Sequence, residues 1–93
     1  MERAVEFLKT TAQMLVENPD AVEVESKIDG LGVLLRLKVD PADMGRILGK
    51  SGARANALRV LLKAIGAQEK ERVSLAIYDP KLDEEWKDGD NGR

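Results

Sequence analysis

The fold of this 93-residue chain is decided by residues 39–54, which read VDPADMGRILGKSGAR. A helix is expected to begin at Pro41, because proline suits the first helical position and the preceding Asp40 can accept hydrogen bonds from the free amides. This short helix should end near Leu48, where the tetrapeptide Gly-Lys-Ser-Gly follows at 49–52. Glycines permit a sharp turn. The stretch therefore predicts two helices joined by a tight loop.

The second helix is expected from about Ala53 to Ile65, with Gly66 closing it. Its apolar residues cover an arc of about 220 degrees, which is wider than the stripe that covers one sheet. The side expected to pack on a sheet consists of Ala55, Leu58, Leu61, Leu62 and Ile65. An adjacent apolar stripe consists of Ala53, Ala57, Val60 and Ala64. Something other than the sheet should cover this second stripe.

Alternation of apolar and polar residues on both sides of this unit indicates strands. One run covers residues 22–28, a second covers 33–39, and the glycine-containing turn at 29–32 lies between them. Two such runs around a turn form a hairpin. The residues expected on the buried face of the first run are Val22, Val24 and Ile28. Residues 73–77 alternate again and predict a third strand.

An amphipathic helix is expected from about Glu2 to Glu17, and Asn-Pro-Asp at 18–20 ends it because proline has no amide donor. The element order is therefore αββααβ, which is typical of an α+β fold. The hairpin makes the first two strands antiparallel, and the two-helix crossover makes the second and third strands parallel. We expect a mixed three-stranded sheet with the second strand in the centre and three helices on one face.

Charge is distributed unevenly along the chain. The net charge of −2 argues against a general polyanion binder, yet residues 41–66 carry five basic side chains against Asp43 alone. The basic residues of this island are Arg46, Lys50, Arg54, Arg59 and Lys63. A basic island in an acidic chain indicates either a local anion site or a solvated helix face.

The Gly-x-x-Gly spacing of Gly49, Lys50, Ser51 and Gly52 is weak by itself, because the same spacing recurs at 89–92. Its context is more specific, since it lies between two helices at the centre of the basic island. The second helix begins at this loop, so its unpaired amides and positive dipole end favour a phosphate there. Lys50 adds a mobile charge and Ser51 a hydroxyl donor. The alternative is a plain helix–helix turn with a capping serine.

Several motifs together resemble a known family of nucleic-acid-binding domains. They are Asn-Pro-Asp at 18–20, Val-Asp-Pro-Ala-Asp-Met-Gly-Arg at 39–46, Ile-Leu-Gly-Lys-Ser-Gly at 47–52, Ala-Leu-Arg at 57–59 and Val-Ser-Leu at 73–75. Over residues 1–79 the chain resembles a K-homology (KH) domain of type II topology, and specifically the small bacterial single-KH-domain RNA-binding proteins of the KhpA (YlqC) family. It departs from the family at Ala53, where a basic residue is common, so Arg54 is expected to supply that charge.

The resemblance implies that single-stranded RNA lies across the domain, with its backbone clamped by the loop at 49–52 and its bases in an aliphatic groove. Arg46 and Arg54 flank the loop and are expected phosphate contacts, the alternative being surface charges. Ile47 and Leu48 are expected to line the groove, the alternative being core packing. The implied role is that of a non-catalytic RNA chaperone or post-transcriptional regulator.

The resemblance also implies protein partners, namely a second copy of the chain or a larger KH/R3H-domain RNA-binding protein (KhpB, also called Jag-like). The first helix, a dimer interface and the RNA groove are the alternatives for covering the second apolar stripe. A rival hypothesis makes the chain an adaptor that dimerises or recruits this partner and has little RNA binding of its own.

Composition narrows the function classes further. The chain has no cysteine and no histidine, which removes disulfides, Cys/His metal sites and imidazole bases and leaves carboxylate, Lys, Ser/Thr and Tyr chemistry. Because the resemblance is to a binding domain, we expect no metal, no cofactor and no enzymatic activity. The sequence has neither an apolar run of membrane-spanning length nor a secretory signal, and we expect a cytoplasmic protein. Residues 80–93 are expected to form a flexible acidic tail in which the carboxylates are solvated.

Overall fold

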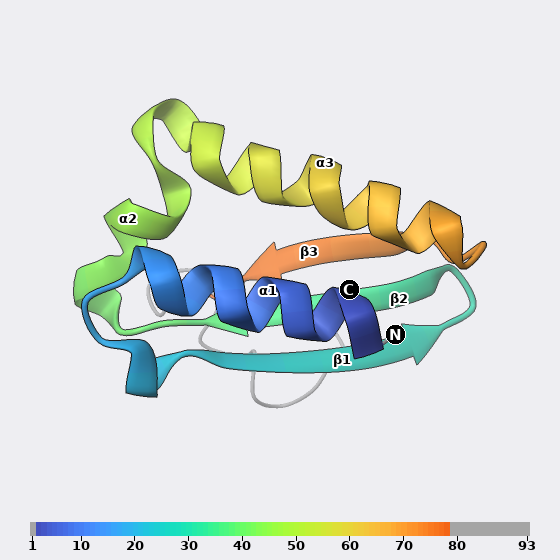
Figure 1. Ribbon diagram of the computed structural model, residues 1–93, viewed down its shortest axis with the longest axis horizontal. Coiled ribbons are helices and arrows are strands. Elements are labelled where there is room, and N and C mark those ends of the chain that lie inside the picture. Colours follow the sequence, from blue (N-terminus) through green and yellow to red (C-terminus); the bar gives the residue numbers. More distant parts are fainter. Residues whose placement is uncertain (1, 79–93) are drawn as a thin grey trace.

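The computed structural model describes residues 2–78 and arranges them as an α+β fold (Figure 1). The α-helices are α1 (Glu2–Leu15), α2 (Met44–Leu48) and α3 (Ala53–Gln68), and the strands are β1 (Glu23–Asp29), β2 (Gly32–Lys38) and β3 (Val73–Ile77). Short 3₁₀ turns lie at Pro19–Ala21, Pro41–Asp43 and Lys50–Gly52. This order confirms the predicted αββααβ arrangement.

The strands form one mixed sheet in the order β1-β2-β3. β1 pairs antiparallel with β2, in a register that places Val24 opposite Leu37 and Ser26 opposite Leu35. β2 pairs parallel with β3, and Leu35 lies opposite Leu75. The central position of β2 and both pairing directions are as predicted.

The core lies between the helices and one face of the sheet. α1 packs against β1 and β2, α3 packs against β3, and the two helices contact each other. Figure 1 shows α2 at one end of the sheet, beside the C-terminal end of α1. Leu8 of α1, Ile47 of α2 and Leu62 of α3 join Leu35 and Leu37 of β2 in a single buried cluster. Full burial of each such side chain contributes about 1.5–3 kcal/mol. All three helices therefore share one core, as predicted.

The hairpin between β1 and β2 differs from expectation at Ile28. The register places Ile28 opposite Val33, so that both lie on the helix side of the sheet. Ile28 is nevertheless 77% exposed. Figure 1 shows the hairpin extending past the end of α1, so α1 does not cover this part of β1. The prediction that Ile28 is buried was wrong, whereas Val22 is buried and Val24 packs against the core.

Two predicted helix ends also differ. α1 ends at Leu15 rather than Glu17, and α3 continues through Gly66 to Gln68. Gly66 is buried within α3, and a Cβ at this position would lie 2.6 Å from Val73 Cγ2 and 2.7 Å from the carbonyl oxygen of Glu71. The glycine is therefore required by the close approach of the returning chain. The prediction that it closes the helix was wrong.

α3 presents apolar side chains to solvent. Ala55, Leu58 and Leu62 are buried as predicted, but Leu61, which was expected to pack on the sheet, is 49% exposed and Val60 is 61% exposed. The stripe that was expected to need a cover is exposed throughout, at Ala53, Ala57, Val60 and Ala64. The first helix therefore does not cover it.

Within residues 2–78, no helix combines the length and the apolar character needed to cross a bilayer. The acidic tail expected at 80–93 lies outside the described residues.

Candidate nucleic-acid interface

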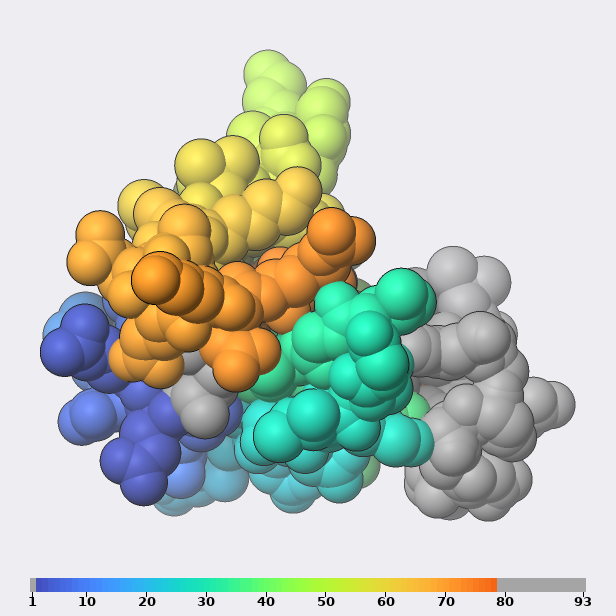
Figure 2. Space-filling model, turned by 90° about the vertical axis from the view of Figure 1, so that its right-hand side faces the viewer, coloured from blue at the N-terminus to red at the C-terminus, as the bar shows by residue number. Residues whose placement is uncertain are grey.

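The Gly-x-x-Gly loop at 49–52 projects from the fold. It joins α2 to α3 and rises beyond both helices in Figure 1, and the same region forms the yellow-green protrusion at the top of Figure 2. Lys50 and Ser51, at the tip of the turn, are both exposed. The structure thus places the loop where a large ligand can reach it.

Most of the loop has a left-handed backbone. The φ angles are 73° at Gly49, 56° at Ser51 and 76° at Gly52. The Gly49 amide donates to the Gly45 carbonyl at 2.9 Å, and the Gly52 amide donates to the Gly49 carbonyl at 3.2 Å, which closes the turn. A residue with a Cβ destabilises the folded state by about 1–2 kcal/mol when its backbone adopts this left-handed conformation. Ser51 bears that cost, and such strain is concentrated at ligand-binding sites.

The two loop glycines satisfy different requirements. A Cβ at Gly49 would lie 2.7 Å from the Arg54 Cβ and 2.9 Å from the Arg54 amide nitrogen. At Gly52 a Cβ would meet nothing within 4 Å, so only its positive φ favours glycine. The first glycine therefore allows the loop to pass closely over α3, and the second allows the turn into it.

At the N-terminal end of α3, the Ala53 amide donates to the carbonyl oxygen of Lys50. The capping position is Gly52, which has no side chain, and no side-chain hydrogen bond caps the helix. The alternative of a capping serine therefore does not hold. The first amides of a helix lack partners within it and carry the positive end of the dipole. This end of α3 is consequently suited to an anion.

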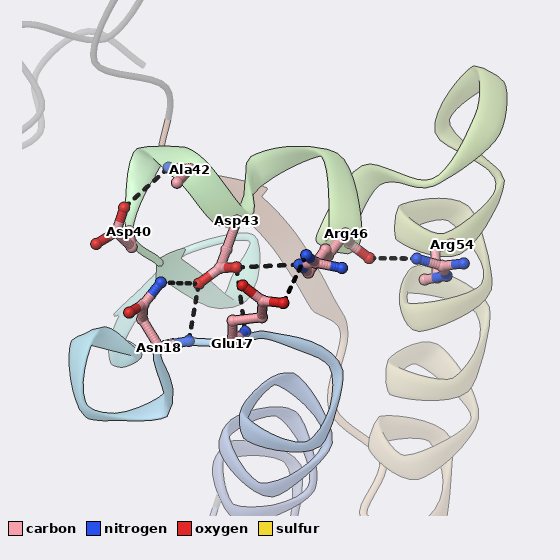
Figure 3. Close-up of polar contacts among 7 residues, drawn as sticks. All are labelled: Glu17, Asn18, Asp40, Ala42, Asp43, Arg46 and Arg54. Atoms are coloured by element: carbon pink, nitrogen blue, oxygen red, sulfur yellow. Dashed lines mark hydrogen bonds and ion pairs between the residues drawn. The ribbon is translucent and has the colours of Figure 1, made fainter.

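The two arginines that flank the loop both have partners inside the fold (Figure 3). Arg54 Nη1 donates to the carbonyl oxygen of Arg46 at 2.7 Å, at the C-terminal end of α2. The Arg46 guanidinium lies 3.0 Å from Glu17 Oε2, through Nη2, and 3.3 Å from Asp43 Oδ1, through Nε. The Arg46 side chain remains about half exposed. The structure thus brings both cations to the base of the loop and orients them.

The site also contains Asp43, for which the sequence predicted no role in binding. It is only 1% exposed. Its carboxylate accepts hydrogen bonds from the Glu17 amide at 3.1 Å and from the Asn18 amide and side chain at 3.0 Å each. Burial raises the pKa of Asp43, but the bonds from Glu17 and Asn18, with the charge of Arg46, outweigh burial and lower the pKa below the ordinary 3.8. The carboxylate is therefore ionised at neutral pH.

The two aliphatic residues before the loop have separate environments. Ile47 is fully buried in the core, whereas Leu48 is exposed beside the loop. Ile47 therefore anchors α2 in the core. Of the two side chains, only that of Leu48 is accessible to solvent.

Comparison with known proteins gives one consistent family. The model of the KhpA/KhpB KH domain matches residues 5–77. The "RNA-binding protein KhpA" of Caldanaerobacter subterraneus subsp. tengcongensis is 47% identical over 72 residues, which cover 77% of this chain and 96% of that protein. The "RNA-binding protein KhpA" of Aquifex aeolicus is 41% identical over 80 residues, which cover 85% of this chain and all of that protein.

Among solved structures, the chain is similar to a part of Aquifex aeolicus Era, crystallised with GDP·AlF4⁻. The TM-score is 0.54 at 20% sequence identity, and the match covers 81% of this chain and 29% of Era. At this identity the likeness concerns the fold alone.

Proposed function

The chain belongs to the KhpA/KhpB KH domain family, and from that premise we propose that it binds single-stranded RNA through the loop at 49–52. One observation carries the proposal. The turn projects into solvent directly before a helix end that no side chain caps, with Lys50 exposed at its tip. Positive dipole ends and lysine side chains both attract phosphates.

Each site residue has a role in the proposal. An RNA phosphate lies against the first turn of α3, where Lys50 supplies charge and Ser51 donates its hydroxyl. Arg46 and Arg54 add positive potential at the base of the loop. Leu48 offers an apolar surface to a base, and Ile47 holds α2 in place beneath it. Such a site holds about four nucleotides, so we expect weak, salt-dependent binding.

The wider role is part of the same proposal. Binding through a backbone clamp requires no chemical step, and we propose that the chain is a non-catalytic RNA chaperone or post-transcriptional regulator. A cytoplasmic location, where transcripts are available, belongs to this proposal as well.

Replacement of the loop tip tests the proposal. In the double variant Lys50→Asp/Ser51→Asp, two carboxylates face the expected phosphate, and affinity for a fluorescently labelled single-stranded RNA at low salt should fall more than about tenfold. The matched control is Lys9→Asp/Thr10→Asp, because Lys9 and Thr10 form a similar pair, exposed on α1. The control has the same change in net charge and should bind nearly as wild type does. Equal losses in both double variants would refute the loop as the site.

A second candidate function is assembly, either as a homodimer or with a larger KH/R3H-domain protein. The observation that favours it is the exposed apolar surface of α3, where Val60 and Leu61 lie side by side in the sequence. This function predicts that the Lys50→Asp/Ser51→Asp variant assembles as the wild type does, because the loop lies outside that surface. Measuring both the RNA affinity and the assembly of the Lys50→Asp/Ser51→Asp variant therefore separates the two functions.

A further inference from the structure

Asp43 is the one charged side chain that is buried in the part of the chain that the structure describes. It stands where the 3₁₀ turn Pro41–Asp43 passes into α2. Its two oxygens accept from Glu17 and Asn18 and contact the Arg46 Nε. A buried carboxylate is costly unless it is fully hydrogen-bonded, so these partners must keep fixed positions relative to one another.

A chain of contacts leads from Asp43 to both arms of the loop (Figure 3). Arg46 binds Asp43 through its side chain, and its carbonyl oxygen accepts the 2.7 Å hydrogen bond from Arg54 Nη1. Arg46 belongs to α2 and Arg54 to the first turn of α3. This hydrogen bond therefore joins the two helices across the base of the loop, and Asp43 ties the pair to the segment that follows α1.

α2 needs support of this kind. It has five residues, and an isolated helix of that length is not stable in water. Ile47 fixes one side of it in the core, and Asp43 fixes its N-terminal end. The direction of α2 determines where the backbone enters the loop at Gly49. If the contacts of Asp43 are weakened, α2 is held less firmly, and the position of the loop changes with it.

We propose that Asp43 is a positioning residue for RNA binding, which holds α2 and the loop at 49–52 in the arrangement that receives the RNA backbone. This inference rests on the proposed RNA-binding function. Asp43 acts through Arg46 and Arg54 and does not itself touch RNA. Electrostatics alone predicts the opposite effect, because removal of a negative charge near the loop should tighten the binding of a polyanion. The direction of the change therefore separates the two explanations.

The test compares two variants with the same change in charge. Asp43→Asn should weaken binding of a fluorescently labelled single-stranded RNA about fivefold to tenfold, which corresponds to the net contribution of about one ordinary hydrogen bond. Asp20→Asn changes an exposed carboxylate in the neighbouring turn Pro19–Ala21 and should bind as wild type or slightly more tightly. Equal or tighter binding by Asp43→Asn would overturn the proposal.

A local readout distinguishes positioning from general loss of stability. Amide hydrogen exchange in the absence of RNA should become faster at Gly49 and Gly52 in Asp43→Asn, while the amides of the central strand β2 exchange as in the wild type. A uniform acceleration that includes β2 would show a role in stability alone and would contradict positioning. If Asp43→Asn does not fold, Asn18→Ala removes a single donor to the carboxylate, and the same two measurements decide the question.

The loop double variant separates this inference from the function on which it rests. If Lys50→Asp/Ser51→Asp loses binding and Asp43→Asn does not, the positioning role fails and the proposed function stands. If the loop double variant binds RNA as the wild type does, both fail.

Discussion

Gly49 and Gly52 have different structural roles, although the motif gives them the same place. The Gly-x-x-Gly spacing treats its two glycines alike, and both could be located from the sequence. The structure separates them, because Arg54 lies against Gly49 and open space surrounds Gly52. The contact with Arg54 depends on how the loop turns into the first turn of α3, which the spacing alone does not specify.

Gly49→Ala should therefore reduce the free energy of unfolding by about 1–3 kcal/mol, because it adds a steric conflict to an unfavourable φ. Gly45→Ala is the matched control. Gly45 lies inside α2 with nothing within 4 Å of its missing Cβ, and alanine should leave stability unchanged or raise it by about 1 kcal/mol. Urea denaturation measures both. Similar effects of the two variants would contradict the assigned role of Gly49.

Asp43 shows what the sequence cannot reveal at this scale. Its place at a helix start is evident from the sequence, but its partners Glu17 and Asn18 are 26 and 25 residues away. No periodic pattern connects them. The Asn-Pro-Asp motif was interpreted as a helix stop and as one of the motifs of the family resemblance. The hydrogen bonds that Asn18 donates to a buried carboxylate required the structure.

Asp43 should also make stability depend on pH. Because the folded-state pKa lies below the ordinary 3.8, its contribution is fully present above that value and is lost as the pH falls through the folded pKa. Wild type should therefore lose stability on acidification below about pH 4. Asp43→Asn should be less stable at neutral pH but lose less on acidification. Urea midpoints measured at neutral and acidic pH compare the two, and identical acid slopes would exclude the contribution of Asp43.

Among the elements, α3 could be predicted in its position and in its second apolar stripe, but not in its end or in the exposure of Leu61. The helical period correctly selected Ala55, Leu58 and Leu62 as buried. A glycine after such a run normally indicates a helix end. At Gly66 the deciding fact is tertiary, since Val73 and Glu71 pack against it when the chain returns as β3. Leu61 was wrongly expected to pack on the sheet, because the helical period does not indicate how much of the α3 surface the sheet covers.

Gly66→Ala tests this account of α3. Helix propensity alone predicts stabilisation of about 1 kcal/mol. The clash with Val73 and the Glu71 carbonyl oxygen predicts a net loss of about 1–3 kcal/mol instead. Urea denaturation of the variant gives the sign directly, and a gain in stability would show that the close approach is not what requires glycine.

At the scale of the whole molecule, connectivity was the most predictable property. A hairpin followed by a two-helix crossover leaves few arrangements of three strands, and the observed sheet is the expected one. The charge pattern also located the loop within the basic island. The hydrogen-bond network around Asp43 and the exposure of Leu61 depend on how the elements pack, and this information is not contained in any local pattern.

The exposed face of α3 should mediate assembly if the second candidate function is correct. Val60→Lys places a charge in this apolar surface and should weaken self-association in sedimentation velocity by about tenfold or more. The thermal midpoint should not change, because Val60 is largely exposed. Asn56→Lys adds the same charge at another exposed position of α3 and is the control. If both variants associate as the wild type does, α3 is not the interface.

The most direct test of the central claim is a titration of the isotopically labelled chain with single-stranded RNA at low salt, followed through the backbone amide signals. The largest shifts should occur at residues 49–55, which cover the loop and the first turn of α3, and these shifts should saturate together. Saturable binding that shifts other amides and leaves these unchanged would contradict that claim.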